Sequence, residues 1–80
     1  MSTTKPRYKR NERMISIVGD NIRKYRKLKG LSQEKLALLC DIETRMVSNY
    51  ERGKVDTNIT MLCLIAEHLG IKPGQLFEEP

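Results

Sequence analysis

The side chains best suited to specific chemistry lie in one short segment, residues 44–54, whose sequence is TRMVSNYERGK. Val47 and Tyr50 are apolar and three positions apart, so they would share the inner face of a helix. The other faces would then present hydroxyl, amide and guanidinium groups from Thr44, Arg45, Ser48, Asn49 and Arg52. Such groups can form hydrogen bonds with the exposed edges of nucleotide bases. An ordinary solvated helix face would carry a similar set of residues.

Several of these groups have a natural partner among the bases. Arg45 could bind O6 and N7 of guanine together, Asn49 could form two hydrogen bonds with adenine, and the methyl group of Thr44 could contact a thymine methyl. The docking angle of the helix decides among these pairings. Arg52 and Lys54 follow where the helix ends, so we expect them to contact phosphates. Arg52 could equally interact with the negative end of the helix dipole.

A second candidate contact lies at Ser32 and Gln33, where another helix is expected to begin. Serine is a favoured N-cap residue. The unpaired backbone N–H groups and the positive dipole end at such a position favour a bound phosphate. A plain capping turn is the alternative interpretation, and both can hold together.

Catalytic chemistry is not indicated by the sequence. His68 is the single histidine, and no nucleophile or metal-ligand cluster accompanies it. No P-loop, dinucleotide motif or metal-ligand spacing occurs. Cys40 and Cys63 lack CxxC spacing, and we expect both to be buried, reduced thiols. We therefore expect no enzyme activity, no cofactor, no metal and no small-molecule ligand.

The excess positive charge is concentrated near the N-terminus. The 80 residues have a formal net charge of +5, and residues 1–13 hold five basic side chains against one acidic. We expect residues 1–13 to form a disordered basic arm that could contact DNA or remain a solvated tail. No apolar run approaches the roughly 20 residues that span a bilayer, and no signal peptide is evident, so a cytoplasmic protein is expected.

The rest of the chain, residues 14–80, has the pattern of one small helical domain. Val18, Ile22 and Tyr25 recur at helical spacing, which predicts a helix from Met14 to Lys29 that stops at Gly30. Further helices are expected from the cap Ser32 to the turn at Asp41, from Glu43 or Thr44 to Arg52, and from the cap Asn58 to Gly70. A fifth, short helix would begin at Pro73 and be docked by Leu76 and Phe77. No segment alternates as a strand would. The expected fold is therefore all-α with five helices.

Two short helices joined by a tight turn inside a helical bundle form the helix-turn-helix pattern. The segment GLSQEKLALLCDIETRMVSNYERGK resembles the helix-turn-helix of the phage-repressor and Cro family, also called XRE-type regulators. ITMLCLIAEHLGIKPGQLF resembles that family's fourth and fifth helices, so the similarity runs from Val18 to Phe77. The resemblance implies a lambda-repressor-like fold with the helix-turn-helix at helices two and three.

The resemblance also implies roles for individual residues, with double-stranded DNA as the partner. The base-contacting residues would be Thr44, Arg45, Ser48 and Asn49. The backbone-contacting residues would be Ser32, Gln33, Arg52 and Lys54. Arg26 and Glu51 match an Arg–Glu pair that the family buries between the first helix and the recognition helix. We assign this pair a structural role, because desolvation offsets much of the attraction in a buried ion pair.

Two positions depart from the family pattern, and both lie in the turn. Asp41 replaces the usual glycine, but aspartate tolerates a left-handed conformation better than most residues, so we expect the turn to form with some strain. Glu43 replaces the usual small cap of the recognition helix. Glutamate caps poorly, and its charge would lie near phosphate.

More apolar residues are present than the inward helix faces require. The surplus consists of Leu38, Leu39, Met61, Leu64, Leu76 and Phe77. An exposed apolar patch often marks a partner surface, so we expect a homodimer, although some of these residues could instead seal the thin core.

The leading function is sequence-specific DNA binding as a transcriptional regulator, expected to be a homodimeric repressor at a palindromic operator, with activation left open. The alternative is a protein-interaction module, antitoxin-like or bridging-factor-like, for which DNA contact is secondary.

Overall fold

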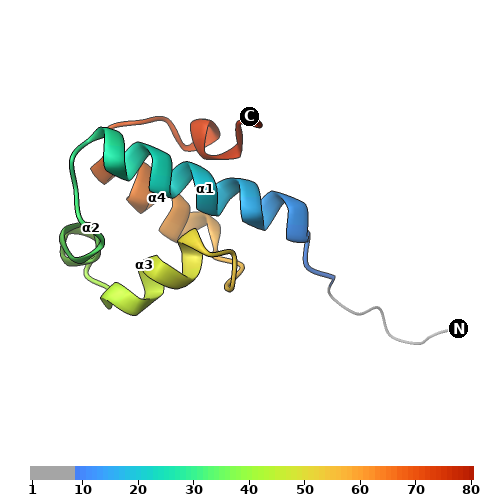
Figure 1. Ribbon diagram of the computed structural model, residues 1–80, viewed down its shortest axis with the longest axis horizontal. Coiled ribbons are helices and arrows are strands. Elements are labelled where there is room, and N and C mark those ends of the chain that lie inside the picture. The colour runs from blue at the N-terminus through green and yellow to red at the C-terminus, as the bar shows by residue number, and fades with distance from the viewer. Residues whose placement is uncertain (1–8) are drawn as a thin grey trace, which may run out of the picture.

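The fold is a small bundle of helices, as the computed structural model shows for residues 9–80 (Figure 1). No strand occurs within that range, so the all-helical prediction is confirmed. The expected fifth helix is a short 3-10 helix, η1. The elements are α1 Glu12–Leu28, α2 Gln33–Cys40, α3 Thr44–Glu51, α4 Ile59–Leu69 and η1 Pro73–Phe77. Of the arm expected over residues 1–13, residues 1–8 lie outside the described residues, and Glu12 and Arg13 belong to α1.

Side-chain caps explain where three of the helices begin. Asn11 Oδ1 accepts from the Met14 backbone N–H at 2.9 Å, and Ser32 Oγ accepts from that of Lys35 at 3.0 Å. Asn58 caps α4 in the same way. Each such cap contributes about 1 kcal/mol. Because Asn11 is the cap, α1 begins at Glu12, two residues before the predicted start.

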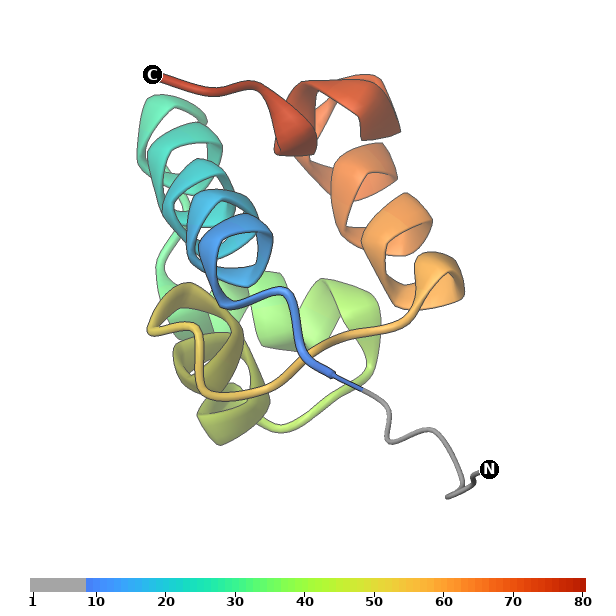
Figure 2. The same ribbon diagram turned by 90° about the vertical axis from the view of Figure 1, so that its right-hand side faces the viewer.

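Every element contributes at least one large, fully buried side chain to the core. These residues are Ile22, Leu36, Val47, Ile65 and Leu76. Helix α1 packs against α3 and η1, and α2 packs against α3 and α4. Figure 2 shows α1 and α4 on opposite sides of the bundle, with η1 next to α4. This shared core therefore fixes α2 and α3 relative to the other helices.

The burial pattern contradicts one expectation about the cysteines and shows that three of the surplus apolar residues seal the core. Cys63 is exposed, because it lies on the outer face of α4 with Ile59, whose exposed fraction is 78%. Leu76 is fully buried, so it does not belong to an exposed patch. Met61 and Leu64 are only half-buried and pack against the core. Cys40 is buried as expected, and burial raises the pKa of its thiol.

The turn between α2 and α3 is formed by Asp41, as predicted. Its φ of 58° is left-handed, and it is the one non-glycine residue with positive φ in the described part of the chain. Its N–H bonds to carbonyls of the last turn of α2, at Ala37 and Leu38. The tight reversal therefore occurs without glycine.

Close contact between α1 and the end of α3 depends on Gly19. A Cβ atom at this position would lie 2.4 Å from the carbonyl oxygen of Tyr50 and 2.9 Å from that of Glu51. Both neighbours are backbone atoms, which cannot rotate away. The approach of the two helices therefore requires a residue without a side chain.

We predict that Gly19→Ala lowers the free energy of unfolding by about 1–3 kcal/mol, because overpacking forces the backbones apart. This loss outweighs the ~0.5–1 kcal/mol that alanine normally gains over glycine inside a helix. Chemical denaturation measures the change. Gly74→Ala is the control, since a Cβ there meets no atom within 4 Å. Equal stability of the two variants would contradict the proposed close contact.

Candidate nucleic-acid interface

Helix α3 separates an inner apolar face from an outer polar face. Val47 and Tyr50 are buried in the core. Arg45 is exposed, with 80% of its side chain accessible, while Thr44, Ser48 and Asn49 are half-buried. Since α3 begins at Thr44, these groups occupy its first turns. The predicted base-contacting residues thus lie together on one short helix.

The buried carboxylate of Glu51 joins three helices. Arg26 of α1 donates from Nε to Oε2 at 2.6 Å and from Nη2 to Oε1 at 3.0 Å. Gln33 of α2 donates from Nε2 to Oε1 at 2.9 Å. The Glu51 side chain is fully buried, and that of Arg26 is 10% exposed. The structure therefore brings together the two residues assigned to an ion pair and adds Gln33 to them.

The charge state of Glu51 follows from these donors. Burial by itself would raise its pKa. The hydrogen bonds from Arg26 and Gln33, the positive charge of Arg26 and a weaker bond from Arg23 outweigh this effect and hold the pKa of Glu51 below its usual range. Glu51 is therefore an anion at neutral pH, and its charge is neutralised inside the protein.

Sequence reasoning missed the contacts that Gln33 and Arg23 make with Glu51. Arg23 Nε lies 3.4 Å from Glu51 Oε1. One signal was available, because Arg23 precedes Arg26 by three positions and so shares its side of α1. Gln33 gave no such signal, since it lies 18 positions from Glu51.

The start of α2 holds Ser32 and Gln33 in different ways. Ser32 is exposed and its hydroxyl caps the helix. Gln33 is half-buried, and one N–H of its amide is directed to Glu51. An amide nitrogen has two hydrogens, so the second can donate to another acceptor. The contact with Glu51 thus orients the Gln33 amide and leaves its second N–H to donate to another acceptor.

Two weak contacts link charged and polar groups at the ends of α3. Arg45 Nη2 lies 3.8 Å from Glu43 Oε1, and both side chains are exposed. Glu43 makes no side-chain cap. At the other end, Arg52 Nη2 donates to Asn49 Oδ1 at 3.4 Å. Exposed ion pairs contribute little to the stability of the fold. A ligand can therefore replace these contacts at a small cost in free energy.

Arg10 fixes the beginning of the described chain beside the end of α3. Its Nη1 donates to the Lys54 carbonyl and its Nη2 to the Gly53 carbonyl, each at 3.1 Å. Its Nε also bonds to Glu12 at 2.9 Å. Lys5 and Arg7 of the basic arm lie outside the described residues. The described part of the chain therefore begins next to Lys54, one of the expected phosphate contacts.

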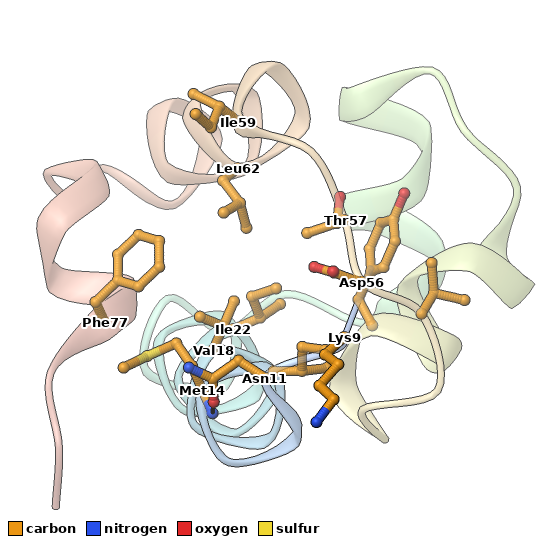
Figure 3. A pocket seen from close by; sticks show the side chains of 13 residues that line it. Lys9, Asn11, Met14, Val18, Ile22, Asp56, Thr57, Ile59, Leu62 and Phe77 are labelled. Carbon is orange, nitrogen blue, oxygen red and sulfur yellow. Dashed lines mark hydrogen bonds between the residues drawn. The ribbon is translucent and has the colours of Figure 1, made fainter. Parts of the chain in front are cut away.

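An apolar cleft of about 260 Å³ opens between α1, α4 and η1 (Figure 3). Val18 and Ile22 form its floor, and Ile59 and Phe77 lie at its α4 and η1 sides. The Thr57 hydroxyl oxygen is buried and has no hydrogen-bond partner. Ile59 and Phe77 are both exposed, so the rim of this cleft carries two accessible apolar side chains.

Metal-ligand clusters and membrane-spanning helices were not found in residues 9–80. No three His, Cys, Asp or Glu side chains gather there in a way that could hold a metal ion. None of the helices there has the length and apolar character needed to cross a membrane.

Comparison with known proteins identifies α2, the turn and α3 as a helix-turn-helix. A helix-turn-helix family profile matches residues 22–76. The control protein C.BamHI of Bacillus amyloliquefaciens is 33% identical over 63 residues, which are 78% of this chain and 78% of that protein.

Two solved structures are similar throughout most of the domain. The restriction-modification controller protein C.AhdI of Aeromonas hydrophila is 35% identical, with a TM-score of 0.76 over 79% of this chain and 96% of that chain. A hypothetical transcription factor of Neisseria, NHTF, is 31% identical, with a TM-score of 0.81 over 96% and 90%. This chain therefore belongs to the helix-turn-helix family of phage-repressor and Cro-type DNA-binding regulators.

Proposed function

We propose that this protein binds duplex DNA at specific sequences through α3 and regulates transcription from the promoter that it occupies. The observation that carries the proposal is the outer face of α3, where four polar side chains project from a helix held to the core by Val47 and Tyr50. A helix placed in the major groove contacts bases through residues near its N-terminal end.

The proposal divides the polar residues into two groups. Thr44, Arg45, Ser48 and Asn49 contact base edges, because they lie on the outer face of α3. Ser32, Gln33, Arg52 and Lys54 contact the phosphate backbone, because they lie at the start of α2 and at the exit of α3. Backbone contacts fix the position of the protein on the duplex, and base contacts supply specificity.

The relatives favour one biological setting. C.BamHI is a control protein, and C.AhdI is a controller protein of a restriction-modification system. At 33% and 35% identity, these proteins support a role for this chain in controlling restriction-modification genes. Repression would follow if the bound protein occludes the promoter.

We propose further that the protein acts as a homodimer, with a second copy covering the cleft bordered by Ile59 and Phe77. These side chains are 78% and 42% exposed, and both line the same hollow. Leu38 and Leu39 are exposed too, but they belong to α2, whose first residues are assigned to DNA. A two-fold dimer presents two copies of α3 to half-sites one helical turn apart, which fits a palindromic operator.

Base recognition predicts a specific change in sequence preference. Duplexes selected from a random pool should share a palindromic consensus. Arg45→Ala and Asn49→Ala should each relax it at defined positions, because one good bidentate contact provides about 1–3 kcal/mol of discrimination. Lys54→Ala serves as the contrast, since losing a phosphate contact should weaken all sequences equally. Enrichment of no sequence by the wild-type protein would rule out the proposed function.

The dimer proposal predicts that Ile59→Glu shifts the protein toward monomer, because a charge would have to be buried in the cleft. Sedimentation equilibrium should show at least a ~10-fold weaker dimer, which corresponds to about 1.4 kcal/mol. Leu28→Glu is the matched control, because Leu28 is 73% exposed on α1 and does not line the cleft. A monomeric wild-type protein that binds DNA only nonspecifically would instead favour the protein-interaction module.

A further inference from the structure

We propose that Arg23 of α1 is a further DNA-backbone residue, which binds the same phosphate as Gln33 and is held in place by Glu51. This inference rests on the proposed DNA-binding function and extends the interface from α2 and α3 to α1. Helix α1 packs against α3, and Figure 1 shows α2 following the C-terminal end of α1. The ligand is a phosphate oxygen of the duplex.

Arg23 and Gln33 bring two donors close together. Arg23 Nε lies 3.4 Å and Gln33 Nε2 lies 2.9 Å from the same atom, Glu51 Oε1. These two nitrogens are therefore no more than about 6.3 Å apart, and the terminal nitrogens of Arg23 belong to the same guanidinium. A phosphate group accepts through several oxygens, so one phosphate can bridge donors at this separation.

The charges around Glu51 leave one positive charge in excess. Arg26 binds both carboxylate oxygens, and its remaining Nη1 donates to the Leu31 carbonyl at 2.9 Å. Arg26 alone thus neutralises Glu51. Each of its three nitrogens already bonds to a protein oxygen, and only 10% of its side chain is exposed, so it is poorly placed to reach DNA. The charge of Arg23 is additional to this pair, so the cluster of Arg23, Arg26 and Glu51 carries one net positive charge. A surplus cation near the surface favours an anion from outside the protein.

The Arg23 side chain is accessible from solvent. Its side chain is 43% exposed, whereas that of Glu51 is completely buried. Within residues 9–80, no protein atom accepts a hydrogen bond from its Nη1 or Nη2. The contact from Nε is long, and a half-exposed pair of this kind contributes little to stability. Glu51 therefore orients the guanidinium, while its terminal nitrogens remain available to a phosphate.

The experiment compares Arg23→Gln with Lys24→Gln, which remove the same charge at adjacent positions of α1. Lys24 is exposed, stacks over the Tyr25 ring and is not part of the Glu51 cluster. Fluorescence anisotropy with the selected operator duplex, repeated at several salt concentrations, gives the affinity and its salt dependence. Arg23→Gln should bind about tenfold more weakly and lower the slope of log K against log salt by about one per protomer. Lys24→Gln should keep the wild-type slope, and Arg23→Lys should restore it.

The proposal also requires that sequence preference and folding stay unchanged in Arg23→Gln. Equal slopes for Arg23→Gln and Lys24→Gln, or a wild-type slope for Arg23→Gln, would overturn the inference while leaving the DNA-binding function intact. A fall in Tm of more than about 5 °C in Arg23→Gln would assign Arg23 a structural role instead. A wild-type protein that selects no duplex would overturn the proposed function and this inference together.

Discussion

The buried carboxylate of Glu51 is the constraint on which the arrangement of the helix-turn-helix depends. Its side chain has no contact with solvent, so donors from the protein must replace the lost hydration. Those donors come from Arg23 and Arg26 on α1 and from Gln33 on α2, while Glu51 itself ends α3. Three helices must therefore keep their relative positions for the charge to remain satisfied.

This constraint is important because α2 and α3 are only eight residues long each. Helices of that length are not stable alone in water, so their positions come from tertiary contacts. Gly19 permits α1 to touch the last carbonyls of α3, and Asp41 reverses the chain between α2 and α3. The ion pair, the close contact and the turn together present the outer face of α3 as a rigid surface.

Local patterns in the sequence were sufficient to predict the helices and the inner face of α3. Helical spacing predicted the buried positions of Ile22, Val47 and Tyr50, and Asp41 was expected in its left-handed conformation. Periodicity fails where burial depends on a neighbour that is distant in sequence. Cys63 lies on an apolar helix but faces outward. Leu76 was expected to dock the fifth helix, and η1 buries it against α1 and α4.

In the candidate site, too, local features could be predicted from the sequence and contacts between distant residues could not. The polar face of α3 is a local property, so it could be predicted from residues 44–54. The convergence on Glu51 is not local, since Gln33 and Arg23 lie 18 and 28 positions away from it. The bonds from Arg10 to the carbonyls of Gly53 and Lys54 span still longer separations. Only the packed structure places these groups within hydrogen-bonding distance.

The pH dependence of stability in the wild-type protein and in Glu51→Gln tests the central role of Glu51 most directly. The folded-state pKa of Glu51 lies below its unfolded value, so its stabilisation is complete above the unfolded pKa and is lost as pH falls through the folded one. The difference in unfolding free energy between the two proteins should be roughly 3–5 kcal/mol at pH 7, the cost of breaking a buried pair. It should stay constant down to about pH 5 and shrink below that. A small difference at pH 7, or one that does not change between neutral and acidic pH, would contradict the account.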